Sequence, residues 1–179
     1  MSLPVHRRRW CRQRLVRGQH QSSGGGVTLD GVRIGAGRSL AIQAPAVQVL
    51  ARKNLSSEVT VSGRTTTKPT TERLVPTALN AGADLSILAT GLAGRDDLGD
   101  IFITGAEVKA GTGQLSLLAA RNVDIASDTT TDTTYSEYYR VKRRLFSKTV
   151  TREIKTTEQE TITPSVLLGA TVSVGAGRN

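Results

Sequence analysis

The chain has 179 residues, 37% of them hydrophobic, which is enough for one core in a single domain. Aromatic residues make up only 3% and there are 18 glycines, which argues against a core of large rings and for one of small β-forming side chains. The net charge is +9, but six arginines and no acidic residue lie in the first 20 positions, so the rest of the chain is only mildly basic.

The segment 1–23 is rich in Arg and Gln and has no apolar periodicity, so we expect a disordered basic tail. Arginines interrupt its apolar pairs, and the sequence as it stands therefore predicts no secretory signal peptide. No apolar run is long enough to predict a membrane span. The arginines suggest one alternative function, which is non-specific binding of nucleic acid through phosphate contacts.

The segment 24–127 consists of pairs of β-forming residues, spaced by two and closed by Gly, Ala, Asn or Asp. Alternation with period two points the paired side chains inward, and three such strands with tight corners make a coil of about 20 residues. The stretch Gly31–Gly37 aligns with Gly105–Gly111, which indicates that the coils repeat. The sequence therefore predicts an all-β fold, a parallel β-helix or β-solenoid.

The block from Leu79 to Ile125 holds the densest series of such pairs, and we expect it to be the best ordered part. The alternation predicts that Leu117 and Ile125 point into the core and that their neighbours Ser116 and Asp124 point outward.

Two segments rich in Thr and charge interrupt the coils. The first, 52–77, is an insertion whose composition leaves two alternatives open, an ordered and a disordered segment. The second, 128–164, has an alternation of its own, with Val141 and Val150 on either side of Leu145–Ser147, and predicts a protruding Thr-rich hairpin or loop. The segment 165–179 resembles the start of a further repeat, which we expect to be truncated.

The predicted hairpin carries the most distinctive surface of the chain, in which basic and aromatic side chains alternate. Such a surface suits acidic glycans, anionic lipid headgroups or another copy of the chain, whereas the alternative is a solvated strand edge protected by its charges. The candidate contact residues are Tyr135, Tyr138, Tyr139, Arg140, Lys142, Arg143, Arg144, Phe146 and Lys148.

The sequence offers little for catalysis or metal binding. His6 and His20 fall in the predicted tail without a partner, and the single Cys11 excludes a cysteine cage. The aspartates between Gly94 and Asp100 resemble one calcium-binding β-roll turn, but one unrepeated copy favours an ordinary polar turn. We therefore expect no enzymatic activity, no cofactor and no metal.

Two stretches resemble the haemagglutinin-repeat region of filamentous haemagglutinin-like exoproteins. One is the Ala-Gly corner in Val108–Gly111, followed by Leu-x-Leu and Val-Asp-Ile within Leu115–Ile125. The other is the charged, Thr-rich stretch around Leu145–Thr149, after which the repeat resumes at Gly169. The resemblance covers roughly residues 24–179, and the family includes two-partner-secreted adhesins and contact-dependent growth inhibition proteins.

The resemblance implies a right-handed parallel β-helix that forms part of a non-enzymatic shaft displaying or delivering other domains. It implies a parent protein that is secreted or on the bacterial cell surface, exported through an outer-membrane β-barrel transporter, and in contact with host or neighbouring-cell glycans or proteins. Without an export signal the chain alone is expected to stay cytoplasmic. The alternative function is a carbohydrate or cell-surface binding module that uses the hairpin, and no specific nucleic-acid partner is expected.

Overall fold

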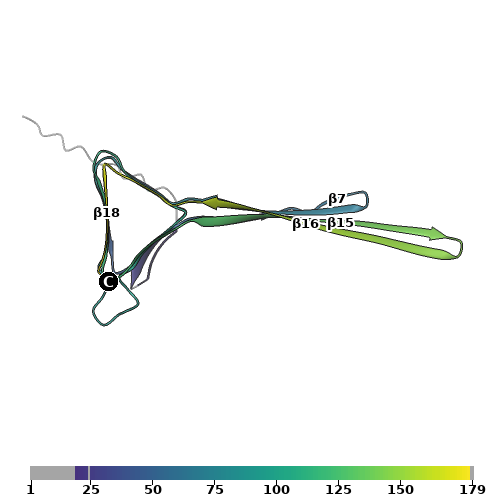
Figure 1. Ribbon diagram of the computed structural model, residues 1–179, viewed down its shortest axis with the longest axis horizontal. Helices are drawn as coiled ribbons and strands as arrows, with labels where there is room; N and C mark the ends of the chain where they lie inside the picture. The colour runs from purple at the N-terminus through teal and green to yellow at the C-terminus, as the bar shows by residue number, and fades with distance from the viewer. Residues whose placement is uncertain (1–18, 24, 178–179) are drawn as a thin grey trace, which may run out of the picture.

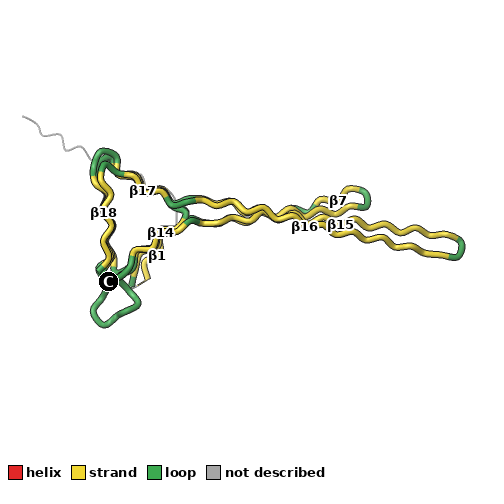
Figure 2. The backbone as a smooth tube through the Cα atoms, in the orientation of Figure 1, coloured by secondary structure: helices red, strands yellow, loops and turns green. Residues whose placement is uncertain are grey.

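The computed structural model describes residues 19–23 and 25–177, whose regular structure consists of strands β1 to β18. These strands form a three-sided solenoid with a thin blade that projects from one corner (Figures 1 and 2). The predicted all-β solenoid is thus confirmed.

Three sheets make the sides of the solenoid. Sheet A contains β1 (Gln19–Ser23), β2 (Gly26–Asp30), β5 (Val47–Leu50), β11 (Ile101–Thr104) and β14 (Val123–Ala126). Sheet B contains β3 (Arg33–Ala36), β9 (Ala78–Ala81), β12 (Glu107–Ala110) and β17 (Val166–Leu168). Sheet C contains β4 (Leu40–Ala44), β10 (Leu85–Ala89), β13 (Gln114–Ala119) and β18 (Thr171–Ala176).

The chain visits sheets A, B and C in turn and so completes four coils. Apart from β1, each strand in these sheets pairs in parallel and in register with the equivalent strand of the next coil. Equivalent side chains therefore stack in rows along the solenoid axis, as in Ile42, Ile87, Leu117 and Val174 of sheet C. Burial of these aliphatic rows supplies the driving force for folding.

Burial along a row depends on whether a coil lies on both sides of it. Leu117 is 0% exposed and its neighbour Ser116 points outward, as the alternation predicted. Ile125 belongs to the same inward row as Ile103, as predicted, yet it is 41% exposed because no described strand pairs with the other side of β14. Its inward direction therefore does not bring the full burial of Leu117.

The prediction of disorder is wrong for residues 19–23. Residues 1–18, with His6 and the arginines, lie outside the described residues, but Gln19–Ser23 forms β1 and includes His20. This strand pairs antiparallel with β2, whose outer edge would otherwise leave backbone groups unpaired. Residues 19–23 therefore belong to the solenoid.

Both Thr-rich segments form strands of the blade, which is sheet D. The insertion 52–77 contains β6 (Arg52–Ser57), β7 (Thr60–Ser62) and β8 (Thr65–Val75). The segment 128–164 contains β15 (Asp128–Arg144) and β16 (Ser147–Thr163), an antiparallel hairpin in which Val141 lies opposite Val150. The predicted hairpin is thus confirmed, and the first insertion is ordered as well.

The buried rows lead to a stability test. Leu117→Asp places an unpaired charge in the core and should lower the free energy of unfolding by several kcal/mol, whereas Ser116→Asp should change it by about 0.5 kcal/mol or less. Ile125→Asp should fall between them, since that side chain is already partly solvated. Denaturant unfolding followed by circular dichroism gives the three values, and equal losses for Leu117→Asp and Ser116→Asp would contradict the inward and outward assignment.

Candidate functional site

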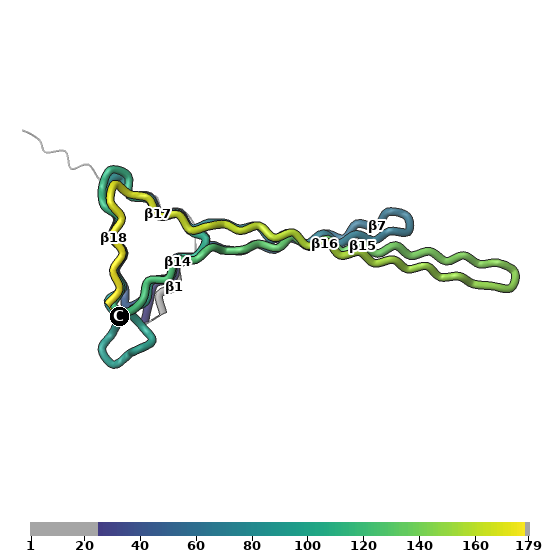
Figure 3. The backbone as a smooth tube through the Cα atoms, viewed as in Figure 1, coloured from purple at the N-terminus to yellow at the C-terminus, as the bar shows by residue number. Residues whose placement is uncertain are grey.

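The blade is the most distinctive candidate for contact with other molecules, because its backbone extends far from the solenoid (Figure 3). The first hairpin (residues 52–77) leaves the solenoid from the second coil, and the second hairpin (residues 128–164) leaves it from the fourth coil. Both leave at the corner between sheets A and B. They then join, since β8 pairs antiparallel with β15 from Thr70 opposite Thr133 to Thr65 opposite Tyr138. The two insertions therefore form one continuous sheet rather than two separate loops.

The first and third coils turn the same corner tightly, through one glycine each. Gly31 and Gly105 have φ of 61° and 59°, a conformation that a residue with a Cβ adopts only with strain. A Cβ on Gly31 would lie 2.7 Å from Arg52 Cβ, and one on Gly105 would lie 2.8 Å from Asp128 Cβ. Each glycine thus leaves room for the hairpin that starts in the next coil.

A buried hydroxyl closes the base of the first hairpin. Thr77 is 0% exposed, and its Oγ1 accepts a hydrogen bond from the Val32 backbone N–H (3.2 Å) and donates one to the Leu50 carbonyl (2.5 Å). The hydroxyl therefore joins the two ends of the hairpin and ties them to the tight corner of the first coil.

The second hairpin repeats this arrangement with a serine. Ser165 Oγ accepts a hydrogen bond from the Ala106 backbone N–H (3.4 Å) and donates one to the Ala126 carbonyl (2.6 Å). Sequence analysis missed both groups, although each hydroxyl residue directly follows a proline, Pro76 or Pro164. The recurrence of Pro-Thr and Pro-Ser at the ends of the two Thr-rich segments is the signal that would have found them.

Side chains bridge the two hairpins near the solenoid, where the tight corner of the third coil separates them. Lys53 Nζ lies 2.9 Å from Asp128 Oδ1 and donates to the Thr129 carbonyl at 2.6 Å. The hydrogen bond to Asp128 raises the pKa of the Lys53 ammonium above its usual value. Further out, the Glu72 N–H donates to Asp132 Oδ1 and Glu72 Oε2 accepts from the Thr131 N–H, both at 3.0 Å.

A polar cluster marks the place where the second hairpin loses the support of the first. Glu137 Oε1 accepts a hydrogen bond from Arg152 Nε (2.7 Å), and Glu137 Oε2 accepts one from the Tyr135 hydroxyl (3.0 Å). The Arg152 guanidinium, and after it the Tyr135 hydroxyl, hold the pKa of the Glu137 carboxyl below its usual value. Arg152 is therefore engaged within the hairpin.

The remainder of this hairpin, residues 140–151, is the tip, and it projects beyond β8. Its turn carries two apolar side chains, Leu145 at 90% and Phe146 at 95% exposure. The tip has five cationic residues and no acidic one, and none of the five takes part in a salt bridge with another described residue. These cationic residues are Arg140, Lys142, Arg143, Arg144 and Lys148.

The nine predicted contact residues do not form a single face. Residues directly opposite each other in the hairpin share a face, and neighbours along a strand alternate. One face carries Tyr135, Tyr139, Arg143 and Lys148, the other carries Tyr138, Arg140, Lys142 and Arg144, and Phe146 lies in the turn. The positive charge therefore surrounds the tip, while Tyr135 and Tyr138 lie nearer the solenoid, in the part paired with β8.

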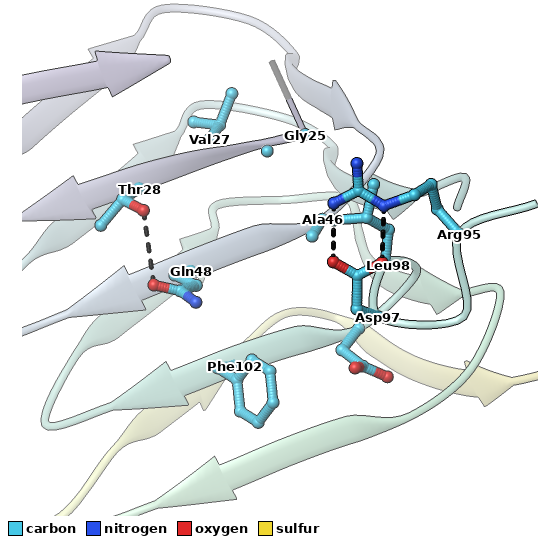
Figure 4. A pocket seen from close by; sticks show the side chains of 11 residues that line it. Gly25, Val27, Thr28, Ala46, Gln48, Arg95, Asp97, Leu98 and Phe102 are labelled. Atoms are coloured by element: carbon cyan, nitrogen blue, oxygen red, sulfur yellow. Dashed lines mark hydrogen bonds and ion pairs between the residues drawn. The ribbon is translucent and has the colours of Figure 1, made fainter. Parts of the chain in front are cut away.

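A second candidate is an open groove of about 480 Å³ beside sheet A (Figure 4). Arg95 and Asp97 at its rim form a two-pronged ion pair with both distances at 2.8 Å, and this contact lowers the Asp97 pKa to about 2. Asp100 Oδ1 accepts hydrogen bonds from the Asn122 backbone and side chain, at 3.0 and 2.9 Å.

Asp97 and Asp100 are thus paired with other residues of the protein. Within residues 19–23 and 25–177, no group of three or more His, Cys, Asp or Glu side chains could hold a metal ion.

Comparison with known proteins gives one match. A protein-family model described as "Hemagglutinin repeat" matches residues 59–179, about two thirds of the chain, and includes most of the blade. Searches of curated proteins and of solved structures found no significant match. In the part of the chain that the structure describes, no helix is long and apolar enough to cross a membrane.

The hydroxyl at the hairpin base has a measurable role. Thr77→Val keeps the shape of the side chain but leaves the Val32 N–H without its partner, while the Leu50 carbonyl keeps only the Gly31 N–H (3.2 Å), so the free energy of unfolding should fall by about 1 to 3 kcal/mol. Thr77→Ser is the matched control, because it keeps the hydroxyl and should lose less. Thermal or denaturant unfolding compares them, and a Thr77→Val protein as stable as Thr77→Ser would refute the assignment.

Proposed function

Because the chain belongs to the Hemagglutinin repeat family, we propose that it is a structural segment of a haemagglutinin-like exoprotein, forming part of the shaft that displays or delivers other domains. Members of this family are generally non-catalytic structural repeats. The parent protein is secreted or on the bacterial cell surface, reaches it through an outer-membrane β-barrel transporter, and contacts host or neighbouring cells. Adhesion and growth inhibition are both consistent with such a shaft.

The observation that carries this proposal is the in-register stacking of the coils. Rows of aliphatic side chains and backbone hydrogen bonds run along the axis without interruption from β2 to β14 and from β4 to β18. Within sheets A, B and C each strand pairs only with the strands of the adjacent coils, whereas the hairpins of the second and fourth coils also pair with each other. Rigidity and length are what such an arrangement provides.

The unit of this shaft is a pair of coils. A compact coil with a glycine corner alternates with a coil that carries a hairpin closed by Thr77 or Ser165. Adding one pair therefore lengthens the solenoid and widens the blade together.

A second candidate function is binding to a cell surface through the second hairpin. The exposure of Leu145 and Phe146 favours it, because two large apolar side chains in water are unfavourable for a purely structural turn. The arginines that suggested nucleic-acid binding lie within residues 1–18, outside the described residues, so that alternative stays a prediction.

The shaft proposal can be tested by adding one unit. A second copy of residues 27–100 is inserted after Asp100. Val27 of the copy then pairs with Val47 in the position that Ile101 occupies in the unmodified protein. Outward Ala41, in the first copy only, and outward Ser173 are replaced by cysteines that carry spin labels. These two positions are three strand steps apart in sheet C of the unmodified protein, and Cys11→Ser removes the native thiol.

Strands are spaced by about 4.8 Å, so the label separation should grow by about 10 Å in pulsed electron resonance. The control is a Gly-Ser insertion of equal length at the exposed Gly94, which should leave the separation unchanged. An unchanged separation in the duplicated protein, or loss of its β-sheet circular dichroism, would contradict the proposal.

A further inference from the structure

We propose that the tip of the second hairpin inserts its turn into anionic lipid membranes. This inference deepens the second candidate function by naming the surface that is bound. It does not depend on the shaft proposal, because a protein whose coils stack as proposed can still fail to bind lipid.

The position of the apolar residues is the first argument. Leu145 and Phe146 occupy the turn between β15 and β16, the part of this hairpin furthest from the solenoid. They are 90% and 95% exposed, and neither contributes to the hydrophobic core. Among the described residues none covers these two side chains, so both can enter a bilayer while the solenoid stays in water.

The distribution of charge is the second argument. Arg143, Arg144 and Lys148 lie within three residues of the apolar pair, on both faces of the hairpin. When Leu145 and Phe146 enter the acyl region, these cations reach the depth of the headgroups. Each lysine or arginine near an anionic bilayer strengthens binding by about fivefold.

The absence of opposing charge is the third argument. The acidic residues nearest the tip in sequence are Glu137, which is engaged by Arg152, and Glu153, which lies 3.2 Å from Lys155. From residue 139 to residue 151 there is no Asp or Glu to repel an anionic surface. The tip is therefore positive all around its circumference and apolar at its end.

A lipid surface fits this arrangement better than a soluble polyanion. Phosphate or sulfate groups of nucleic acids and glycans would engage the cations, but they offer no apolar phase for Leu145. A bilayer satisfies both kinds of side chain at once.

The test uses the full chain and vesicles of phosphatidylcholine, alone or mixed with phosphatidylglycerol. The double variant Leu145→Ser with Phe146→Ser should weaken binding to the mixed vesicles by at least about tenfold, the effect of exposing two large apolar side chains. The triple variant Arg143→Gln, Arg144→Gln and Lys148→Gln should weaken it by about a hundredfold. The wild-type protein should bind zwitterionic vesicles much more weakly.

Matched controls account for the other charges and apolar groups of the chain. Val59→Ser with Val61→Ser removes exposed apolar residues from the first hairpin, and Arg33→Gln, Arg38→Gln and Arg73→Gln removes three exposed cations elsewhere. The arginines of residues 1–18 are present in every protein compared, so differences report the tip alone. All substituted side chains are exposed, so circular dichroism should remain unchanged.

Insertion is followed directly with an environment-sensitive dye on Ser147→Cys in a Cys11→Ser background. Its emission should shift to the blue on mixed vesicles. Equal binding by the apolar tip variant and its control, or no blue shift, would overturn the proposal. Binding to heparin or DNA that is insensitive to the Leu145 and Phe146 substitutions, without vesicle binding, would identify a soluble polyanion as the partner instead.

Discussion

The parallel, in-register pairing between successive coils is the constraint on which the whole molecule depends. Because each strand lies about 4.8 Å from its neighbours, every position in one coil faces the same position in the next. The interior can then hold only side chains that stack on their own equivalents, which explains the rows of Ile, Leu, Val and Ala and the scarcity of aromatic rings. It also explains why burial falls at the last coil, where Val174 is half exposed although it continues the row of Leu117.

The same constraint decides how the hairpins leave the solenoid. A hairpin needs space at the corner of the coil before it, and Gly31 and Gly105 provide that space by having no Cβ. The base then needs acceptors for the Val32 and Ala106 backbone N–H groups, and the hydroxyls of Thr77 and Ser165 supply them. Alternation of compact and hairpin-bearing coils thus follows from local geometry, and it places the two hairpins close enough to join into one blade.

The two ends of the blade differ in the pairing of their charges and in the exposure of their apolar side chains. In the part of the blade nearer the solenoid some of the charges are paired, as in Lys53 with Asp128 and Glu137 with Arg152. Beyond the end of the first hairpin the cations have no acidic neighbours and the turn is apolar. The tip thus differs from the rest of the blade in combining cations that form no salt bridge with other described residues and exposed apolar side chains. A repeat whose solenoid is rigid and internally hydrogen-bonded can carry such a tip without loss of stability, because the tip contributes nothing to the hydrophobic core.

Features that depend on neighbours along the chain could be predicted from the amino-acid sequence alone. Alternation showed that Leu117 points inward and Ser116 outward, and the paired β-formers around Leu145–Ser147 predicted the second hairpin. Only the tertiary structure decided the burial of Ile125, the pairing of β8 with β15, the strand β1 and the hydroxyl contacts of Thr77 and Ser165. It also distributed the predicted contact residues over two faces. These features arise between segments far apart in the sequence, and a periodic pattern fixes which way a side chain points but not which strand lies against it.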